Sequence, residues 1–204
     1  MNYTLYPSLG TEHILQLRFT EGLESYYPGT LADAPATFQG RNRNWFEIRY
    51  RYERYAPLSK WFTFGFLGEA TFSNHPDFAT PLATAMSLPA FQPTPLMRTM
   101  FMPEFRSRSY LAAGVMPVFN IINNLYIKSY VYAFVPQEVV YDHGWTGDVW
   151  NRLRERSEFV FGGSLVYQTF IGPASLTISK FSTGRSAWQV VFNFGYTLFS
   201  SRRF

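Results

Sequence analysis

The most constraining feature of the sequence is the alternation in the stretch NWFEIRYRYERY, residues 44–55. Aromatic and aliphatic residues hold one parity, and the other carries a charged ladder of Glu47, Arg49, Arg51 and Glu53. Successive side chains of a strand point to opposite faces, so a period of two predicts a β-strand rather than a helix. The pattern alone leaves two environments open. In a soluble sheet the aromatic side chains would face a core, whereas in a membrane barrel they would face lipid and the charges would line the lumen.

The composition favours the membrane alternative. Aromatic residues make up 20% of the chain and charged residues only 16%, against about 25% charged residues in typical globular chains. This balance is typical of a barrel with an apolar exterior. Cysteine is absent, which excludes disulfides, thiolate metal sites and cysteine nucleophiles. The basic residues form no cluster and no binding motif, so we expect no nucleic-acid partner, and nothing indicates a cofactor.

Eight segments with alternating character predict eight strands, near residues 13–27, 44–55, 60–72, 108–121, 124–136, 157–171, 174–181 and 187–199. The two segments 108–121 and 124–136 alternate less cleanly, and the sequence does not assign their faces. Short turns at APLSK, NN and GP alternate with long connections, which is the habit of outer-membrane barrels. The longest connection, 73–107, contains six prolines, and we expect it to lack regular structure.

The predicted strands have the length needed to cross a membrane, about 9–11 residues when tilted. No run of eighteen apolar residues exists, so a transmembrane helix is not expected. The first ten residues lack a signal-peptide pattern, so the numbering follows either a mature product or a piece of a longer chain. We predict one all-β domain over residues 1–204, an antiparallel transmembrane β-barrel of about eight strands or the C-terminal half of one of about sixteen. A soluble antiparallel barrel or sandwich is the alternative.

The C-terminal segment WQVVFNFGYTLF resembles the last strand of outer-membrane barrels of the bacterial surface antigen superfamily, which includes the barrel assembly factors. In that family, alternating aromatic residues around a glycine form the assembly signal. The resemblance implies this role for Phe192, Phe194, Gly195, Tyr196, Leu198, Phe199 and Phe204. The tail SSRRF departs from the family pattern, because it continues beyond the usual aromatic end.

Other segments resemble the same superfamily in the same order, among them YPSLGTEHILQLRF and YQTFIGPASLTIS, the latter with its turn at Ile171, Gly172 and Pro173. GLESYYPGT and NLYIKSYVYAFVPQ are similar to the barrel that follows the lipase domain of patatin-like proteins. The loop 73–107 occupies the place of the family's inward-folding loop, and its arginine would correspond to Arg106. The serine elbow of the lipase is absent, since GGSLV at 162–166 does not supply it.

Three functions remain open from the sequence. The first is a non-enzymatic barrel in the outer membrane of Gram-negative bacteria, acting as an anchor or in protein or lipid translocation. Its partners would be outer-membrane lipid and, during insertion, the barrel assembly machinery. The second is the membrane portion of a patatin-like phospholipase whose catalytic domain lies elsewhere. The third is a small barrel enzyme acting on lipids, for which His143, with Asp142 and Asp148, is the weak candidate site.

Several side chains have both a functional and a structural interpretation. The charged ladder could line a pore or ligand site, but a structural plug of ion pairs is favoured, because an eight-stranded barrel has an interior just wide enough for side chains. His13 and His75 are expected to be structural or exposed to solvent. Arg152, Arg154 and Arg156 could bind anionic headgroups or simply face solvent. A small closed barrel is the preferred assembly, and a homodimer of half-barrels is the alternative.

Overall fold

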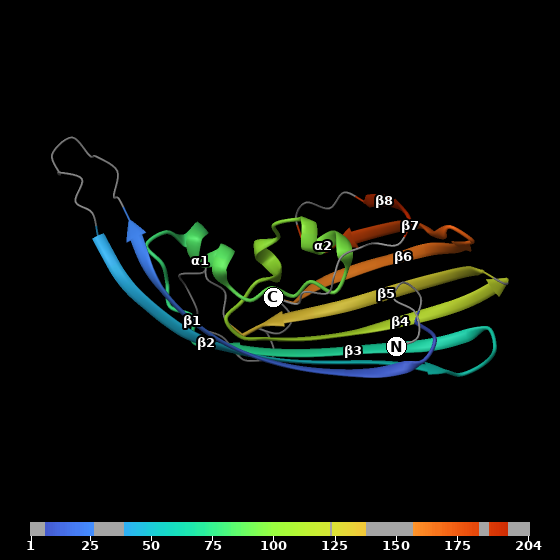
Figure 1. The fold of residues 1–204 in the computed structure, drawn as a ribbon, viewed down its shortest axis with the longest axis horizontal. Coiled ribbons are helices and arrows are strands. Elements are labelled where there is room, and N and C mark those ends of the chain that lie inside the picture. Colours follow the sequence, from blue (N-terminus) through green and yellow to red (C-terminus); the bar gives the residue numbers. More distant parts are fainter. Residues whose placement is uncertain (1–6, 27–38, 123, 138–156, 184–187, 196–204) are drawn as a thin grey trace.

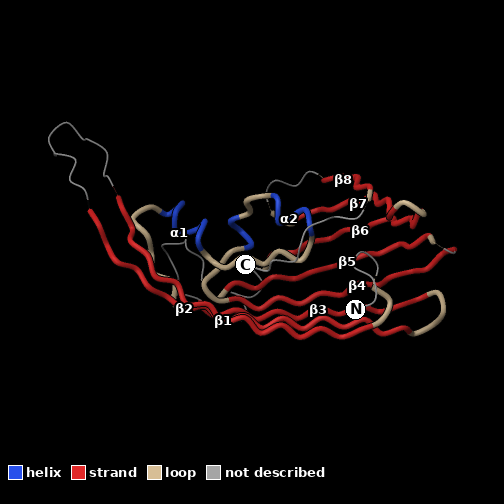
Figure 2. Tube along the Cα trace, in the orientation of Figure 1, coloured by secondary structure: helices blue, strands red, loops and turns tan. Residues whose placement is uncertain are grey.

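The computed structural model describes residues 7–26, 39–122, 124–137, 157–183 and 188–195. They form one eight-stranded antiparallel sheet in the order β1-β2-β3-β4-β5-β6-β7-β8 (Figures 1 and 2). The strands are β1 Gly10–Tyr26, β2 Gln39–Pro57, β3 Phe62–Ser73, β4 Tyr110–Ile122, β5 Leu125–Pro136, β6 Glu158–Thr169, β7 Gly172–Phe181 and β8 Gln189–Phe194. The predicted all-β fold with eight antiparallel strands is confirmed.

Each strand pairs with its neighbours in sequence, so the sheet is a simple meander. The three predicted tight turns lie at one end of it. Asn124, in the β4–β5 turn, has a φ of 76°, which asparagine tolerates better than most residues. The β6–β7 turn differs from the prediction, because it is formed by Phe170 and Ile171. Gly172 and Pro173 instead open β7, and the first residues of a strand are a position where proline is tolerated.

The prediction that residues 73–107 lack regular structure is wrong. This connection contains two short helices, α1 Pro81–Ser87 and α2 Pro95–Thr99, and a 3₁₀ turn η1 Pro103–Phe105. Proline occupies the first turn of each one, where its missing N–H would be unpaired in any case. Thr80 and Thr94 accept hydrogen bonds from the amides of Ala83 and Met97 at the two helix starts. Half of the prolines therefore begin helical turns rather than prevent them.

The hydrophobic core lies between the concave face of the sheet and this connection, which we call the inner loop (residues 74–109). Figure 1 shows α1 and α2 on the concave side of the curved sheet. Phe91 packs within 6.2 Å, between ring centroids, of Tyr110, Tyr132 and Phe134. Phe105 contacts Phe134 and the distant Phe181. The inner loop is thus bound to the inner face of β4, β5 and β7.

Contact with the inner loop explains why the faces of β4 and β5 were unclear from the sequence. The inward side chains Tyr110, Met116, Tyr132 and Phe134 are buried, while the opposite parity of β4 is exposed at Leu111 and Val115. At Tyr110, Tyr132 and Phe134 the inner face is apolar like the outer one, because it meets Phe91 and Phe105 of the loop instead of water. Successive side chains of β4 therefore still alternate between buried and exposed, but they do not alternate between polar and apolar.

The sheet is open in the described part of the chain. Among those residues, β1 pairs only with β2 and β8 only with β7. The small closed and filled barrel preferred from the sequence is not what the structure shows. The physical reason is the inner loop, because its helices occupy space that the lumen of a closed eight-stranded barrel lacks.

Candidate functional site

The convex face of the sheet is a continuous apolar surface, which we call the outer face. Large side chains of every strand contribute to it. Those with exposed fractions between 37% and 70% include Leu15, Leu17, Phe19, Phe46, Ile48, Tyr50, Phe64, Phe66, Leu111, Val131, Phe161, Leu165, Leu176, Ile178, Val190 and Phe192. The cross-strand register aligns them: Leu17 is opposite Ile48, and Ile48 is opposite Phe72. An exposed apolar surface of this extent on one side of a sheet indicates contact with a nonpolar phase or partner.

The charged ladder lies on the opposite, inner face. Glu47 and Glu53 are buried and Arg49 and Arg51 are largely so. The main pairs form along the same strand, with Arg49 Nη2 3.1 Å from Glu47 Oε1 and Arg51 Nη2 2.8 Å from Glu53 Oε2. A longer contact joins neighbouring strands, with Arg18 of β1 4.0 Å from Glu47 of β2.

Two residues outside the predicted ladder complete this network. Glu69 on β3 lies 3.7 Å from Arg51 and accepts a hydrogen bond from the Tyr110 hydroxyl at 2.6 Å. Lys128 on β5 places its ammonium 5.7 Å from the centroid of the Tyr55 ring. Its more buried members, Glu47, Glu53 and Glu69 with Arg49, Arg51 and Lys128, balance in formal charge, and the more exposed Arg18 lies at its edge. Buried charges that are mutually paired are a structural arrangement rather than a free binding site.

Close contacts between tyrosine and glycine form a third feature of the inner face, which the sequence pattern did not reveal. Tyr55 of β2 crosses over Gly65 of β3, and its hydroxyl reaches the Met116 sulfur of β4 at 3.2 Å. Tyr130 of β5 crosses over Gly162 of β6 in the same way. Its hydroxyl lies 2.7 Å from that of Ser179 on β7. Each ring therefore ties three strands together, and the glycine leaves space for it.

Arg106 holds the inner loop closed on itself. Its Nη1 donates hydrogen bonds to the carbonyl oxygens of Met86 at 2.8 Å and Leu88 at 3.0 Å. The guanidinium also lies 5.2 Å from the centroid of the Phe101 ring. These contacts join the end of α1 to the segment after η1. Arg106 thus belongs to a loop that folds over the inner face, although its equivalence to the family's arginine remains a prediction.

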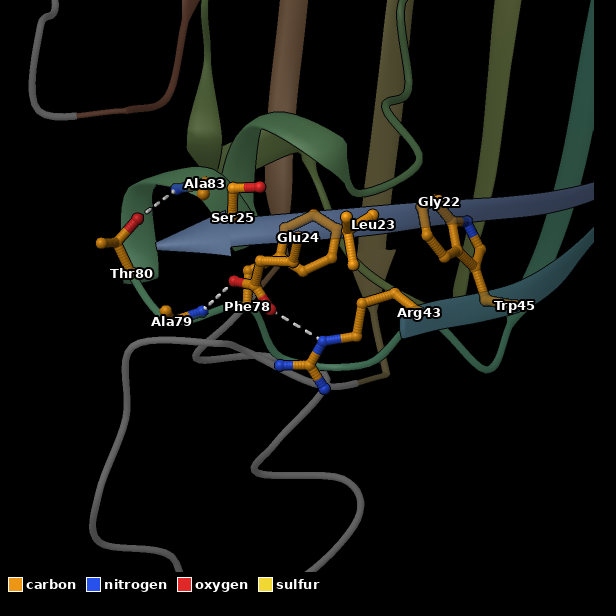
Figure 3. Close-up of a pocket in the computed structure, with 10 residues that line it drawn as sticks. All are labelled: Gly22, Leu23, Glu24, Ser25, Arg43, Trp45, Phe78, Ala79, Thr80 and Ala83. Atoms are coloured by element: carbon orange, nitrogen blue, oxygen red, sulfur yellow. Dashed lines mark hydrogen bonds and ion pairs between the residues drawn. The ribbon is translucent and has the colours of Figure 1, made fainter. Parts of the chain in front are cut away.

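A shallow pocket of about 300 Å³ lies where the inner loop meets the ends of β1 and β2 (Figure 3). Glu24 is its central charged group. Its carboxylate accepts from Arg43 Nε at 2.8 Å and from the Ala79 amide at 2.6 Å. Leu23, Trp45 and Phe78 supply apolar walls. Because both carboxylate oxygens are hydrogen-bonded within the protein, Glu24 tethers the inner loop to the sheet.

His75 lies beside this pocket and is almost fully buried, with 2% exposure. Its ring packs on Trp45 and Phe78 at centroid distances of 4.6 and 4.9 Å, and Arg43, Asp77 and Arg108 are the nearby charged groups. Neither ring nitrogen has a hydrogen-bond partner among the described residues. Burial lowers the pKa of this imidazole below its ordinary value. The expectation of a structural histidine fits this packing, whereas His13 is exposed and lies 2.8 Å from the Tyr50 hydroxyl.

Some of the remaining predicted residues lie in the described part of the chain and others lie outside it. Phe192 and Phe194 lie on the outer face of β8 and are exposed, and Gly195 follows with a φ of 91°. The other proposed members of the assembly signal, Tyr196, Leu198, Phe199 and Phe204, lie outside the described residues. So do the candidate site at His143, Asp142 and Asp148 and the arginines at 152, 154 and 156.

Two other kinds of functional element are not found among the described residues. Within the described ranges, no group of three or more histidine, aspartate or glutamate side chains is arranged to hold a metal ion. In the same part of the chain, no helix is both long and apolar enough to cross a membrane. No protein-family model, curated protein or solved structure matches the chain.

Proposed function

We propose that this chain is an integral outer-membrane β-barrel protein of the bacterial surface antigen type, without enzymatic activity of its own, that serves as a membrane anchor. The observation that carries the proposal is the outer face, where exposed apolar side chains cover all eight strands. A soluble sheet would bury such a face against a second layer, but here the covering layer lies on the concave side (Figure 1).

The dimensions of the strands support a membrane location. Strands β1 to β7 contain between 10 and 19 residues, and a tilted strand needs about 9–11 to cross the hydrocarbon core. Trp61 and Trp188, each about 60% exposed, lie just before β3 and β8. Aromatic residues at strand ends suit the membrane interface, where an apolar ring and a polar N–H are both accommodated.

The inner face favours an anchor over an open pore. Arg49 and Arg51 form ion pairs with Glu47 and Glu53 within the sheet. The inner loop packs on β4, β5 and β7. A substrate could pass only if this loop moved away. Translocation of protein or lipid, the other role implied by the resemblance, would therefore require displacement of residues 74–109.

The proposal is tested by membrane integration of the chain in a Gram-negative host, directed to the envelope by an added export signal. We expect it in the outer-membrane fraction, resistant to alkaline and urea extraction, with heat-modifiable gel migration. Recovery as a soluble monomer without detergent would contradict a membrane role. A lysophospholipid and phospholipid hydrolysis assay on the purified chain should show no turnover above the detergent blank.

Two variants of neighbouring residues on β7 sharpen this test. Ile178 is 40% exposed on the outer face, whereas Thr177 points inward and is hydrogen-bonded to Ser164 at 2.8 Å. Arginine on the lipid face of a barrel costs about 2–4 kcal/mol near the bilayer midplane. Ile178→Arg should therefore reduce insertion into vesicles much more than Thr177→Arg. Equal insertion of the two variants would show that the outer face does not meet lipid.

A further inference from the structure

The two edge strands of the sheet, β1 and β8, each pair with only one neighbouring strand among the described residues. On the outer face, Leu17 of β1 is 70% exposed, whereas Ile48 directly opposite it on β2 is 40% exposed. At the other edge, Phe192 of β8 is 67% exposed and its partner Leu176 on β7 is 40% exposed. The edge residues are more exposed because each lacks a neighbouring strand on one side. Each edge also carries backbone N–H and C=O groups that are directed away from the sheet.

The two edges match each other in polarity and direction. Both carry apolar side chains on the outer face, such as Leu17 and Phe192, and polar ones on the inner face, such as Gln16 and Asn193. Every pairing in the meander is antiparallel and the strands number eight, so β1 and β8 run in opposite directions. An antiparallel β1–β8 pair would therefore continue the ladder and extend both faces without a break in polarity.

The inner loop determines which copy of β8 can reach β1. The concave face of this sheet holds α1, α2 and η1, with Phe91 and Phe105 packed against β4, β5 and β7. A helix with its side chains is about 10–12 Å wide, while a closed eight-stranded barrel encloses only side chains. Closure of β1 onto β8 within one chain would thus require expulsion of the loop and exposure of its core. A barrel of about sixteen strands has an interior wide enough for such loops.

We propose that two copies of this chain complete one barrel, with β1 of each copy paired to β8 of the other around a two-fold axis that runs along the barrel. The partner is a second copy because the edges of one chain are complementary to each other, and a two-fold arrangement satisfies both edges at once. This inference rests on the proposed membrane location, since free edge groups are most costly in lipid. In this dimer the inner loop of each copy would fill half of the interior of the shared barrel.

Disulfide cross-linking tests the pairing directly, because the natural chain contains no cysteine. Two full-length chains with different tags are co-expressed, one carrying Gln16→Cys and the other Asn193→Cys. The register is scanned with cysteines at Ile14 and Arg18 on β1 and at Gln189 and Val191 on β8. We expect cross-links between the two tags in one register only, and a native mass of two chains in mild detergent. Ser164→Cys, on the inner face of β6, which is paired on both sides, replaces the β1 cysteine as the control and should not cross-link to Asn193→Cys.

The other outcomes would overturn the proposal. A chain carrying both Gln16→Cys and Asn193→Cys that closes only within itself would indicate an eight-stranded barrel with a displaced loop. Cross-links between the Gln16→Cys residues of two copies would indicate that β1 pairs with β1 rather than with β8. A native mass of one chain without cross-links would indicate that β1 and β8 pair with strands of some other protein or not at all. Extraction resistance is measured on the same membranes, so loss of dimerisation with retained integration refutes only this inference, whereas loss of integration refutes the proposed function.

Discussion

Gly65→Ala is the substitution whose effect follows most directly from the geometry of the inner face. An added Cβ would lie 2.6 Å from Cε1 of Tyr55 and 2.7 Å from the carbonyl oxygen of Met116. Contacts below 3.0 Å are essentially never made by Cβ atoms. The Tyr55 ring cannot turn aside freely, because its hydroxyl is held by the Met116 sulfur. The backbone oxygen belongs to the neighbouring strand, so relief requires that β3 and β4 separate locally.

We expect Gly65→Ala to lower the free energy of unfolding by about 1–3 kcal/mol, the usual cost of overpacking. Gly68→Ala is the matched control, since it lies on the same strand and its added Cβ would meet only the Phe66 ring at 3.5 and 3.8 Å. Replacement of glycine by alanine at an unstrained position stabilises by about 0.4–1 kcal/mol through the unfolded chain. The control should therefore be neutral or slightly stabilising.

The assay is reversible urea unfolding in phospholipid vesicles, followed by tryptophan fluorescence. A second measurement in the Tyr55→Ala background separates the two contacts, because removal of the ring leaves only the Met116 oxygen in conflict with the new methyl group. We expect the cost of Gly65→Ala to be smaller in that background. Identical unfolding midpoints for Gly65→Ala and Gly68→Ala would refute the argument that tyrosine rings crossing glycines tie the strands together.

Two further predictions concern the inner loop. Burial lowers the pKa of the His75 imidazole below its ordinary value of 6.5. Between the folded and the unfolded pKa, the unfolded chain therefore binds a proton at His75 that the folded chain does not. The free energy of unfolding should fall as the pH decreases below 6.5 and level off below the folded pKa. His75→Phe should reduce this pH dependence in urea titrations at pH 5 to 8, and an unchanged slope would contradict the assignment. Arg106→Ala removes hydrogen bonds to two carbonyl oxygens of the loop, each worth about 1.5–3 kcal/mol when the donor is charged and buried, and less for Arg106 because it is partly exposed. Limited proteolysis should cut residues 80–104 faster in Arg106→Ala than in the exposed control Arg54→Ala, and equal rates would show that Arg106 does not hold the loop.

The period-two pattern determined the strands and the faces of most of them. Phe46 and Ile48 lie on the exposed face of β2 and the charged ladder on the other, as predicted. This succeeds because side-chain alternation is a local property of an extended backbone and requires no knowledge of partners. The turn positions followed from similarly local signals, apart from Gly172 and Pro173.

Tertiary structure decided the features that no single segment of the sequence specifies. The faces of β4 and β5 depend on the inner loop, because Phe91 of the loop covers apolar inward side chains such as Tyr132 and Phe134. The roles of Glu69 and Gly65 depend on cross-strand register, which joins residues from different segments. The open sheet depends on the same loop, because closure is set by the volume within the concave face rather than by the pattern of any strand. Local periodicity specifies where each side chain points, but only packing specifies what it meets.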